Sequence, residues 1–178
     1  MELQTKRLIL RPFTEGDAAD LYEYAKDPRV GPMAGWPVHK NVEESLETIR
    51  NVFTKPYDLA FVDKKTGKVI GSGGLMDRHR DWLPGKNDEI GCVLHPDYWG
   101  QGLGVEAMEE FFRIGFEELL LDHIWSGYYD GNEKSKRLQE KLGMVPWGEP
   151  RWVDVPLMGE RRLEHVNLLR RTEWEGRR

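Results

Sequence analysis

A short segment past the middle of the chain alternates glycine with other residues just before an amphipathic stretch. Glycine stands at Gly100, Gly102 and Gly104, and apolar residues then recur at a helical period from Val105 to Leu119. A glycine-rich turn at the start of a helix presents several unpaired backbone N–H groups and the positive end of the helix dipole to one point. Glycine also permits the close approach and the positive φ that such a turn needs. The pattern therefore predicts an anion site, typically for phosphate, rather than a simple tight connection.

The residues after the third glycine argue against two common nucleotide-binding motifs. A P-loop places Lys and then Ser or Thr after its last glycine, whereas Val105 and Glu106 follow Gly104. A dinucleotide fingerprint needs glycine at position 105 and opens a βαβ unit near a domain start. Nucleoside-triphosphate hydrolysis is therefore disfavoured, and a dinucleotide-binding protein is only a remote alternative.

Strand and helix patterns alternate along the chain around this turn. Period-two apolar runs and turn residues predict strands, while apolar residues at helical spacing predict helices. The expected strands are 7–13, 59–62, 68–76, 89–94, 123–129, a segment near Val153, and 163–169. The expected helices are 18–25, 42–53, 105–119 and 132–142, and the proline-rich segment 29–40 is expected to be an irregular loop. This order predicts an α/β fold with a mixed sheet.

Length and composition set the outer bounds. The 178 residues suit one domain, and a net charge of -5 argues against a nucleic-acid partner. Cys92 is the only cysteine, so no intramolecular disulfide can form and a reducing compartment fits. Without a signal-like start or a run of about 20 apolar residues, we expect a soluble cytoplasmic protein without a membrane partner. We expect one domain over 1–172 and a solvated, charged tail over 173–178.

The segment from His95 to Ala107 resembles the acyl-CoA pyrophosphate loop of the GCN5-related N-acetyltransferases (GNAT), most of all the branch related to ribosomal-protein N-terminal acetyltransferases. The resemblance extends to Thr5–Phe13, Glu89–Gly91, Asn132–Ser135 and Glu140–Met144, in family order across nearly the whole chain. It implies the GNAT fold, a mixed and largely antiparallel V-shaped sheet with helices on both faces. It also implies an acetyltransferase that uses acetyl-CoA as co-substrate, modifies a primary amine by direct attack and needs no metal.

The resemblance assigns the binding of acetyl-CoA to two groups of residues. The pyrophosphate would be held by Gly100, Gln101, Gly102, Leu103, Gly104 and Val105. The pantetheine arm would pair with the backbone of Cys92, Val93 and Leu94, and Asn132 would reach its end. Trp99 departs from the Gln or Arg that often starts the family's loop, but phosphate binding there relies mostly on backbone N–H groups.

The catalytic residues follow the family pattern less closely. Many members place a tyrosine near the thiolate as general acid, whereas Gln139 stands at the matching position here. Ser135 is the candidate acid, with an ordinary serine of a first helical turn as the alternative. Glu89 is the expected general base, with a surface carboxylate at a strand end as the alternative. Asp77 and His79 are the next candidates for the base.

Other residues bear on the acceptor and on competing functions. No His or Asp is spaced to activate Cys92, so we expect an inert thiol and no covalent route. The loops that contain Trp36 and Trp82 are the expected acceptor contacts, and the acidic balance suggests a cationic acceptor. Protein N-termini and small amines both stay open, and a homodimer is a candidate assembly. The alternative to an enzyme is a non-catalytic acyl-CoA sensor or interaction module, which Gln139 favours.

Overall fold

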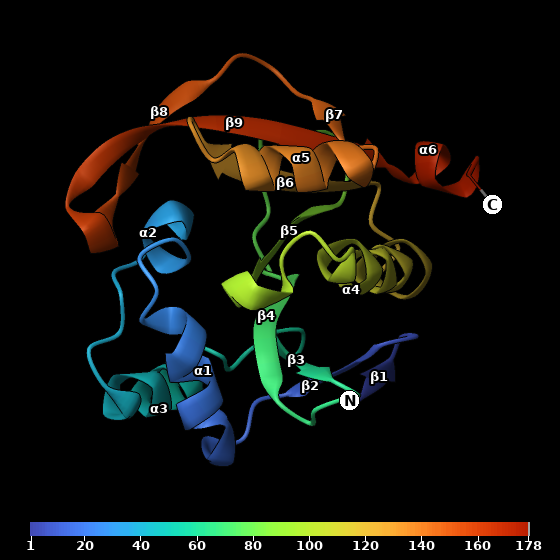
Figure 1. Ribbon diagram of the computed structural model, residues 1–178. Coiled ribbons are helices and arrows are strands. Elements are labelled where there is room, and N and C mark those ends of the chain that lie inside the picture. Colours follow the sequence, from blue (N-terminus) through green and yellow to red (C-terminus); the bar gives the residue numbers. More distant parts are fainter. Residues whose placement is uncertain (178) are drawn as a thin grey trace.

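The computed structural model describes residues 1–177, which build one sheet of nine strands with helices on both faces (Figure 1). The sheet order is β1-β2-β3-β4-β5-β6-β9-β7, and β8 also pairs with β9. The strands are β1 (Leu3–Gln4), β2 (Leu8–Pro12), β3 (Leu59–Asp63), β4 (Val69–Leu75), β5 (Asn87–Leu94), β6 (His123–Tyr129), β7 (Val145–Pro146), β8 (Arg151–Val155) and β9 (Glu160–Arg170). Within residues 1–177 the only parallel pair is β5 with β6. The expected mixed, largely antiparallel sheet is confirmed.

The helices fall between the strands, as the sequence order predicts. They are α1 (Ala18–Ala25), α2 (Gly31–Ala34), α3 (Val42–Asn51), α4 (Leu103–Arg113), α5 (Glu133–Lys141) and α6 (Arg171–Glu175). A π-helical turn (Ile114–Glu118) continues α4, and short 3-10 turns occupy Glu15–Asp17, Pro96–Tyr98 and Pro156–Met158. Among the helices of residues 1–177, none is long and apolar enough to cross a membrane.

Local side-chain chemistry explains where several elements begin and end. The Asn41 side chain accepts a hydrogen bond from the Glu44 N–H at 2.9 Å, which caps the first turn of α3. Gly67 adopts φ 73° at the tip of the β3–β4 hairpin, and Gly143 adopts φ 70° just after α5. Left-handed conformations of this kind strongly favour glycine. These caps are therefore local properties of the sequence, and three of the expected element boundaries rest on them.

Two apolar layers hold the helices on opposite faces of the sheet. On one face, α4 packs Ala107, Met108 and Phe111 into a cluster that includes Phe61 of β3 and Ile90 of β5. On the other face, α1 and α3 pack against Ala60 and Val62 of β3, together with Val69 of β4. Alternate residues of each strand therefore serve opposite layers. The same alternation separates the functional groups described below.

Besides the short strands β1 and β7, which were not expected, the structure departs from the expected elements in three places. The segment 29–40 contains the short helix α2, with Trp36 packed tightly against Gly31. Helix α4 begins at Leu103, inside the glycine run, because Gly102 takes a left-handed conformation as its N-cap. The expected solvated tail from residue 173 instead contains α6, whose Trp174 is 6% exposed and lies 5.4 Å from Phe116 between ring centroids. The last residue of that expected tail, residue 178, lies outside the described residues.

The packing of α4 on the sheet yields a stability prediction. Phe111 is fully buried, and its ring centroid lies 6.1 Å from that of Phe61. Phe111→Ala should lower the free energy of unfolding by about 3–5 kcal/mol, because it removes buried area and leaves a cavity. Urea unfolding measures the loss. The control Val52→Ala, at a side chain 59% exposed, should change it by less than about 0.5 kcal/mol. A similar small loss for both variants would contradict the assigned core.

Candidate functional site

The two parallel strands diverge soon after they meet. Residues 87–89 of β5 pair with residues 123–125 of β6, and no pairing between these strands continues beyond that point. From there β5 follows β4 as far as Leu94, while β6 follows β9 as far as Tyr129. In Figure 1 the β1–β4 arm and the β6–β9 arm accordingly occupy the lower and upper halves of the molecule. The sheet therefore opens between the carboxyl ends of two neighbouring strands, which is a common place for ligands in α/β proteins.

The register of β5 decides which backbone groups face this opening. Met76 N–H donates to the Glu89 carbonyl at 2.9 Å and His95 N–H donates to the Ile70 carbonyl at 2.7 Å. Because hydrogen-bonded pairs alternate along antiparallel strands, Val93 also directs its backbone groups toward β4. Cys92 and Leu94 direct theirs toward the opening. The expectation that Val93 pairs with pantetheine is therefore wrong, because its backbone N–H and C=O groups point toward β4 within the sheet.

The glycine turn lies at the carboxyl end of β5, at the start of α4. Gly100 and Gly102 adopt φ 73° and 76°, and a Cβ on Gly104 would lie 3.4 Å from Leu138 of α5. Within the described chain, no N–H from Gly100 to Val105 has a hydrogen-bond acceptor, and the first amide of α4 to be bonded is that of Glu106, to the Gly102 carbonyl. The turn thus presents consecutive free donors at a helix N-terminus, as the sequence predicts.

A long-range clamp fixes the turn in this conformation. The Glu106 carboxylate accepts hydrogen bonds from Thr5 Oγ1 and from the Arg7 backbone N–H, both at 2.6 Å, and from Arg7 Nε at 2.7 Å. Arg7 also donates to the Gln101 carbonyl at 2.8 Å. Partial burial opposes the charge of Glu106, but these hydrogen bonds outweigh it and lower the pKa. The segment before β2 therefore holds the loop, so the Thr5–Arg7 resemblance has a structural reason.

Trp99 anchors the other end of the turn. Its indole Nε1 donates to the Leu94 carbonyl at 2.9 Å, so the loop is tied back to the end of β5. Lys134 Nζ lies 4.5 Å and the Arg29 guanidinium 5.5 Å from the indole ring centroid. Two cationic side chains therefore lie against Trp99 beside the free N–H groups, which favours an anionic ligand.

Glu89 lies on the face of the sheet opposite α4 and pairs with Trp125 in the last residue pair before the strands diverge. Its side chain is 16% exposed, and burial raises its pKa, although the guanidinium of Arg78 lowers it in part. Arg78 Nη1 donates to Glu89 Oε2 at 3.0 Å. A desolvated carboxylate of raised pKa at an opening is a better proton acceptor than a surface glutamate. The surface-carboxylate alternative does not fit this burial.

The loop that carries Arg78 is held by a neighbouring carboxylate. Asp88 accepts hydrogen bonds from the backbone N–H groups of Asp77 at 3.1 Å, Arg78 at 2.6 Å and Glu89 at 2.7 Å. Because the Asp88 carboxylate already binds three backbone N–H groups, we do not expect it to bind the amine substrate. The sequence predicts Glu89 as the base, but it does not show that Asp88 anchors the loop. The two carboxylates have different surroundings because side chains alternate along β5.

Ser135 and Asn132 lie at the start of α5, which Figure 1 shows in front of β6 and β9. Asn132 Oδ1 caps the helix by accepting from the Ser135 N–H at 3.2 Å, and its Nδ2 donates to the Met33 carbonyl at 3.2 Å. Ser135 is partly exposed, and its Oγ accepts from Gln139 Nε2 at 3.1 Å. Because Gln139 links Ser135 to Asn167 on the α4 side of β9, Ser135 lies on the face of the sheet opposite Glu89.

The other candidates for the base are exposed: His79 lies 3.4 Å from Asp81, and Asp77 is exposed on the same loop. Trp36 packs against His39 and the layer of α1 and α3, whereas Trp82 lies 5.8 Å from the Arg80 guanidinium and packs against the cluster that contains Trp125. Burial raises the pKa of the half-buried Cys92 thiol to about 12, which keeps it protonated and supports its expected inertness.

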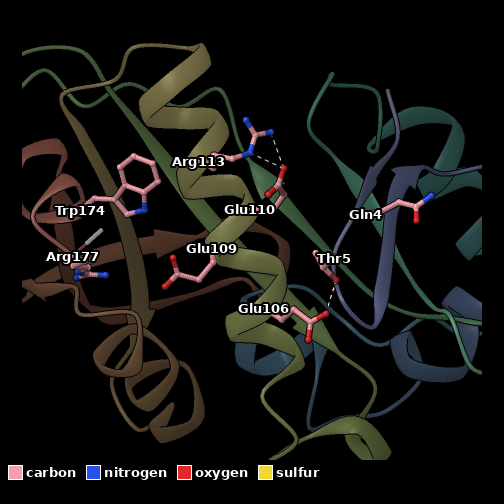
Figure 2. A pocket seen from close by; sticks show the side chains of 8 residues that line it. All are labelled: Gln4, Thr5, Glu106, Glu109, Glu110, Arg113, Trp174 and Arg177. Atoms are coloured by element: carbon pink, nitrogen blue, oxygen red, sulfur yellow. Dashed lines mark hydrogen bonds and ion pairs between the residues drawn. The ribbon is translucent and has the colours of Figure 1, made fainter.

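A separate surface hollow of about 460 Å³ lies along the outer side of α4. Figure 2 shows Thr5 and Glu106 at one side of it, Arg113 and Glu110 along the helix, and Trp174 near the far side. Its charged groups already pair with one another, since Arg113 and Glu110 are 2.7 Å apart and Glu106 holds the clamp described above. This hollow therefore lacks the free donors that distinguish the opening between β5 and β6.

Comparison with known proteins agrees with this geometry. The model of the acetyltransferase (GNAT) domain matches residues 7–145, which contain β5, the glycine turn and α5. The uncharacterized N-acetyltransferase YnaD of Bacillus subtilis is 30% identical over 154 residues, covering 81% of this chain and 82% of YnaD.

Solved structures show the same fold at lower identity. A GNAT-family acetyltransferase from Bacillus anthracis has a TM-score of 0.81 at 23% identity and covers 97% of this chain and 100% of its own. A ribosomal-protein-S5-alanine acetyltransferase from Vibrio fischeri has a TM-score of 0.71 at 20% identity and covers 98% of both chains. The resemblance and the fold expected from it are confirmed. With free amides at the start of α4, a sheet that opens beside them and a family match across most of its length, the chain belongs to the GNAT family of acetyltransferases and is an acyltransferase enzyme.

Proposed function

We propose that this enzyme transfers the acetyl group of acetyl-CoA to a primary amine, by direct attack of the amine while both substrates are bound. The observation that carries the proposal is the run of unbonded N–H groups from Gly100 to Val105 at the open end of the sheet. Residues 100–102 are exposed, whereas Leu103 and Gly104 are buried, and free N–H groups of buried residues at a helix N-terminus favour a ligand with several acceptor oxygens. The pyrophosphate of CoA has this character.

The pantetheine arm would then follow the open edge of β5. Cys92 and Leu94 direct their backbone groups there, and the Leu94 carbonyl already accepts from Trp99. The Leu94 N–H is left to donate to the thioester carbonyl oxygen, where negative charge develops during attack. Asn132 already accepts from the Ser135 N–H through Oδ1 and donates to the Met33 carbonyl through Nδ2. It would contact the end of the arm only through the hydrogen-bonding capacity that these two bonds leave.

The two faces of the sheet supply the proton-transfer groups. On the acceptor side, Glu89 would take a proton from the attacking amine through a chain of waters. On the α5 side, Ser135 would donate its hydroxyl hydrogen to the sulfur as the C–S bond breaks and the electron pair moves to sulfur. The hydroxyl would regain a proton from solvent. Because the two residues lie on opposite faces of the sheet, Glu89 can accept a proton and Ser135 can donate one without transferring it to each other.

The acceptor would approach on the Glu89 face. Arg80 lies 4.4 Å from the Trp125 ring centroid and 3.8 Å from Glu164, and Arg162 lies 5.1 Å from the Tyr129 ring centroid. This mixed lining suits an amine attached to a polar chain, such as a protein N-terminus, with a small amine as the alternative. The Vibrio fischeri fold neighbour named for ribosomal protein S5 favours the first. A cytoplasmic location fits the free thiol of Cys92, and the homodimer stays a prediction.

Thiol release from acetyl-CoA, measured across peptides, amino acids and polyamines, tests the reaction. At least one amine should release thiol well above the hydrolytic background and become acetylated. The non-catalytic sensor predicts a different result, in which acetyl-CoA raises the melting temperature but no amine in the panel releases thiol. That second result would overturn the proposed reaction.

Gly102→Val tests the placement of the pyrophosphate. A β-branched side chain is strained at φ 76° and would cover the free amides, so affinity for CoA should fall at least about tenfold. Gly67→Val is the matched control, because Gly67 has φ 73° at a hairpin tip with open space around it. Calorimetric titration gives the affinities, and melting without ligand reports the shared backbone strain. Equal CoA affinity in the two variants would refute this placement.

The pH profile tests Glu89 as the base. Because burial raises the pKa of Glu89, kcat/KM should rise with pH through a midpoint above the usual value of about 4.3. Arg78 lowers that pKa, so Arg78→Gln should raise it and move the acidic limb to higher pH. Arg50→Gln removes the same charge at an exposed pair with Glu15 and should leave the limb in place. Glu89→Gln should abolish the limb and lower kcat about a hundredfold, so a limb that persists in this variant would exclude Glu89.

A further inference from the structure

Two buried amide side chains lie beneath Ser135 and are linked to it. Gln139 is 2% exposed and Asn167 is 4% exposed, although both are strongly polar. Gln139 Nε2 donates to the Gly127 carbonyl at 3.3 Å and to Ser135 Oγ at 3.1 Å. Asn167 Nδ2 donates to Gln139 Oε1 at 2.9 Å. A chain of hydrogen bonds therefore runs from β9, through α5, to the candidate acid.

The direction of this chain follows from the chemistry of its fixed end. The Gly127 carbonyl can only accept, so the end of the Gln139 amide that faces it must be the nitrogen. The oxygen of the same amide then faces Asn167, which must present its own NH₂ group. The second N–H of Gln139 is directed at Ser135. Both hydrogens of Gln139 are thus assigned, and a flip of the amide would place its oxygen against the Gly127 carbonyl and lose that bond.

Ser135 is consequently the acceptor in its bond with Gln139. Its own hydroxyl hydrogen cannot point at Gln139, because an N–H already occupies that direction. Over residues 1–177 the Ser135 hydroxyl donates to no acceptor. The partly exposed serine thus keeps one donor available on the side away from the buried amides. An ordinary serine in a first helical turn would instead cap or contact the local backbone.

We infer that Gln139 is a positioning residue which, held by Gly127 and Asn167, directs the Ser135 hydroxyl hydrogen toward the sulfur of CoA. The inference rests on the proposed function. Gln139 is 2% exposed, so its effect on a bound sulfur would be exerted through Ser135. As the C–S bond breaks, its electron pair moves to sulfur, and the Ser135 hydroxyl stabilises that charge by hydrogen bonding.

The thiol pKa of bound CoA tests the inference without an acceptor. Thiolate ultraviolet absorbance is followed against pH in the complex, with the CoA-free protein subtracted. Cys92 is silent near neutral pH, because burial raises its pKa to about 12. A hydrogen bond to the thiolate lowers the thiol pKa, so Ser135→Ala should raise it by about one unit. Gln139→Met, which is neutral and close in size, should raise it by about half a unit.

A double-mutant cycle separates positioning from general damage. Gln139→Met should have no further effect on the thiol pKa once Ser135→Ala is present, because the hydroxyl that it positions is gone. Asn167→Ala should act in the same direction as Gln139→Met and provides a second variant if the first unfolds. Arg137→Gln, at an exposed position of the same helix, should leave the thiol pKa unchanged. Equal effects of Gln139→Met with and without Ser135 would overturn the inference.

The outcomes distinguish the inference from the proposed function. If CoA binds and no amine is acetylated, the proposed reaction fails while the thiol pKa still decides the role of Gln139. If CoA binds with the same thiol pKa in the wild type, Ser135→Ala and Gln139→Met, the inference fails and acetyl transfer can stand. If CoA does not bind to the wild type, both fail.

Discussion

The short parallel pairing between β5 and β6 is the constraint on which the site depends. Because the two strands share only residues 87–89 and 123–125, each then follows its antiparallel partner into a separate arm of the sheet. The opening leaves backbone groups of Cys92 and Leu94 without a strand to bond. It also brings the N-terminal end of α4 beside α5, since Gly104 lies near Leu138 and Lys134 lies 4.5 Å from the Trp99 ring centroid. Unpaired amides and helix dipoles are thereby concentrated at one place.

Alternation along the strands around this opening divides the chemistry between two faces. Ile90 and Cys92 pack with the α4 layer, whereas Glu89 projects to the opposite side. On β9, Asn167 contacts Gln139 of α5 while Glu164 lies near Arg80 on the other face. A carboxylate of raised pKa and a hydroxyl donor are kept apart in this way. Had they shared a face, they could hydrogen-bond to each other and lose their separate roles.

Features that depend on local sequence could be predicted, and those that depend on distant contacts could not. The Asn41 cap, the Gly67 turn and the glycine run before α4 each have a local cause and could be read from neighbouring residues. The α/β order followed from periodicity, but the topology needed the family resemblance. The orientation of Val93 requires the β4 register, and the role of Gln139 requires Asn167, which lies 28 positions away in the sequence. Trp174 stands between charged residues in the sequence, so no local pattern predicted that it would be buried.

Strand β9 has a consequence for the time at which the site can assemble during synthesis. It contributes Asn167 to the hydrogen-bond chain behind Ser135, and it pairs with β6 along that strand's whole length. The clamp of the anion-binding turn, by contrast, uses side chains and backbone only up to Glu106. On a ribosome that releases residues in order, all partners of the clamp emerge before Asn167 does. The hydrogen-bond chain behind Ser135 is thus the last part of the site that synthesis can complete.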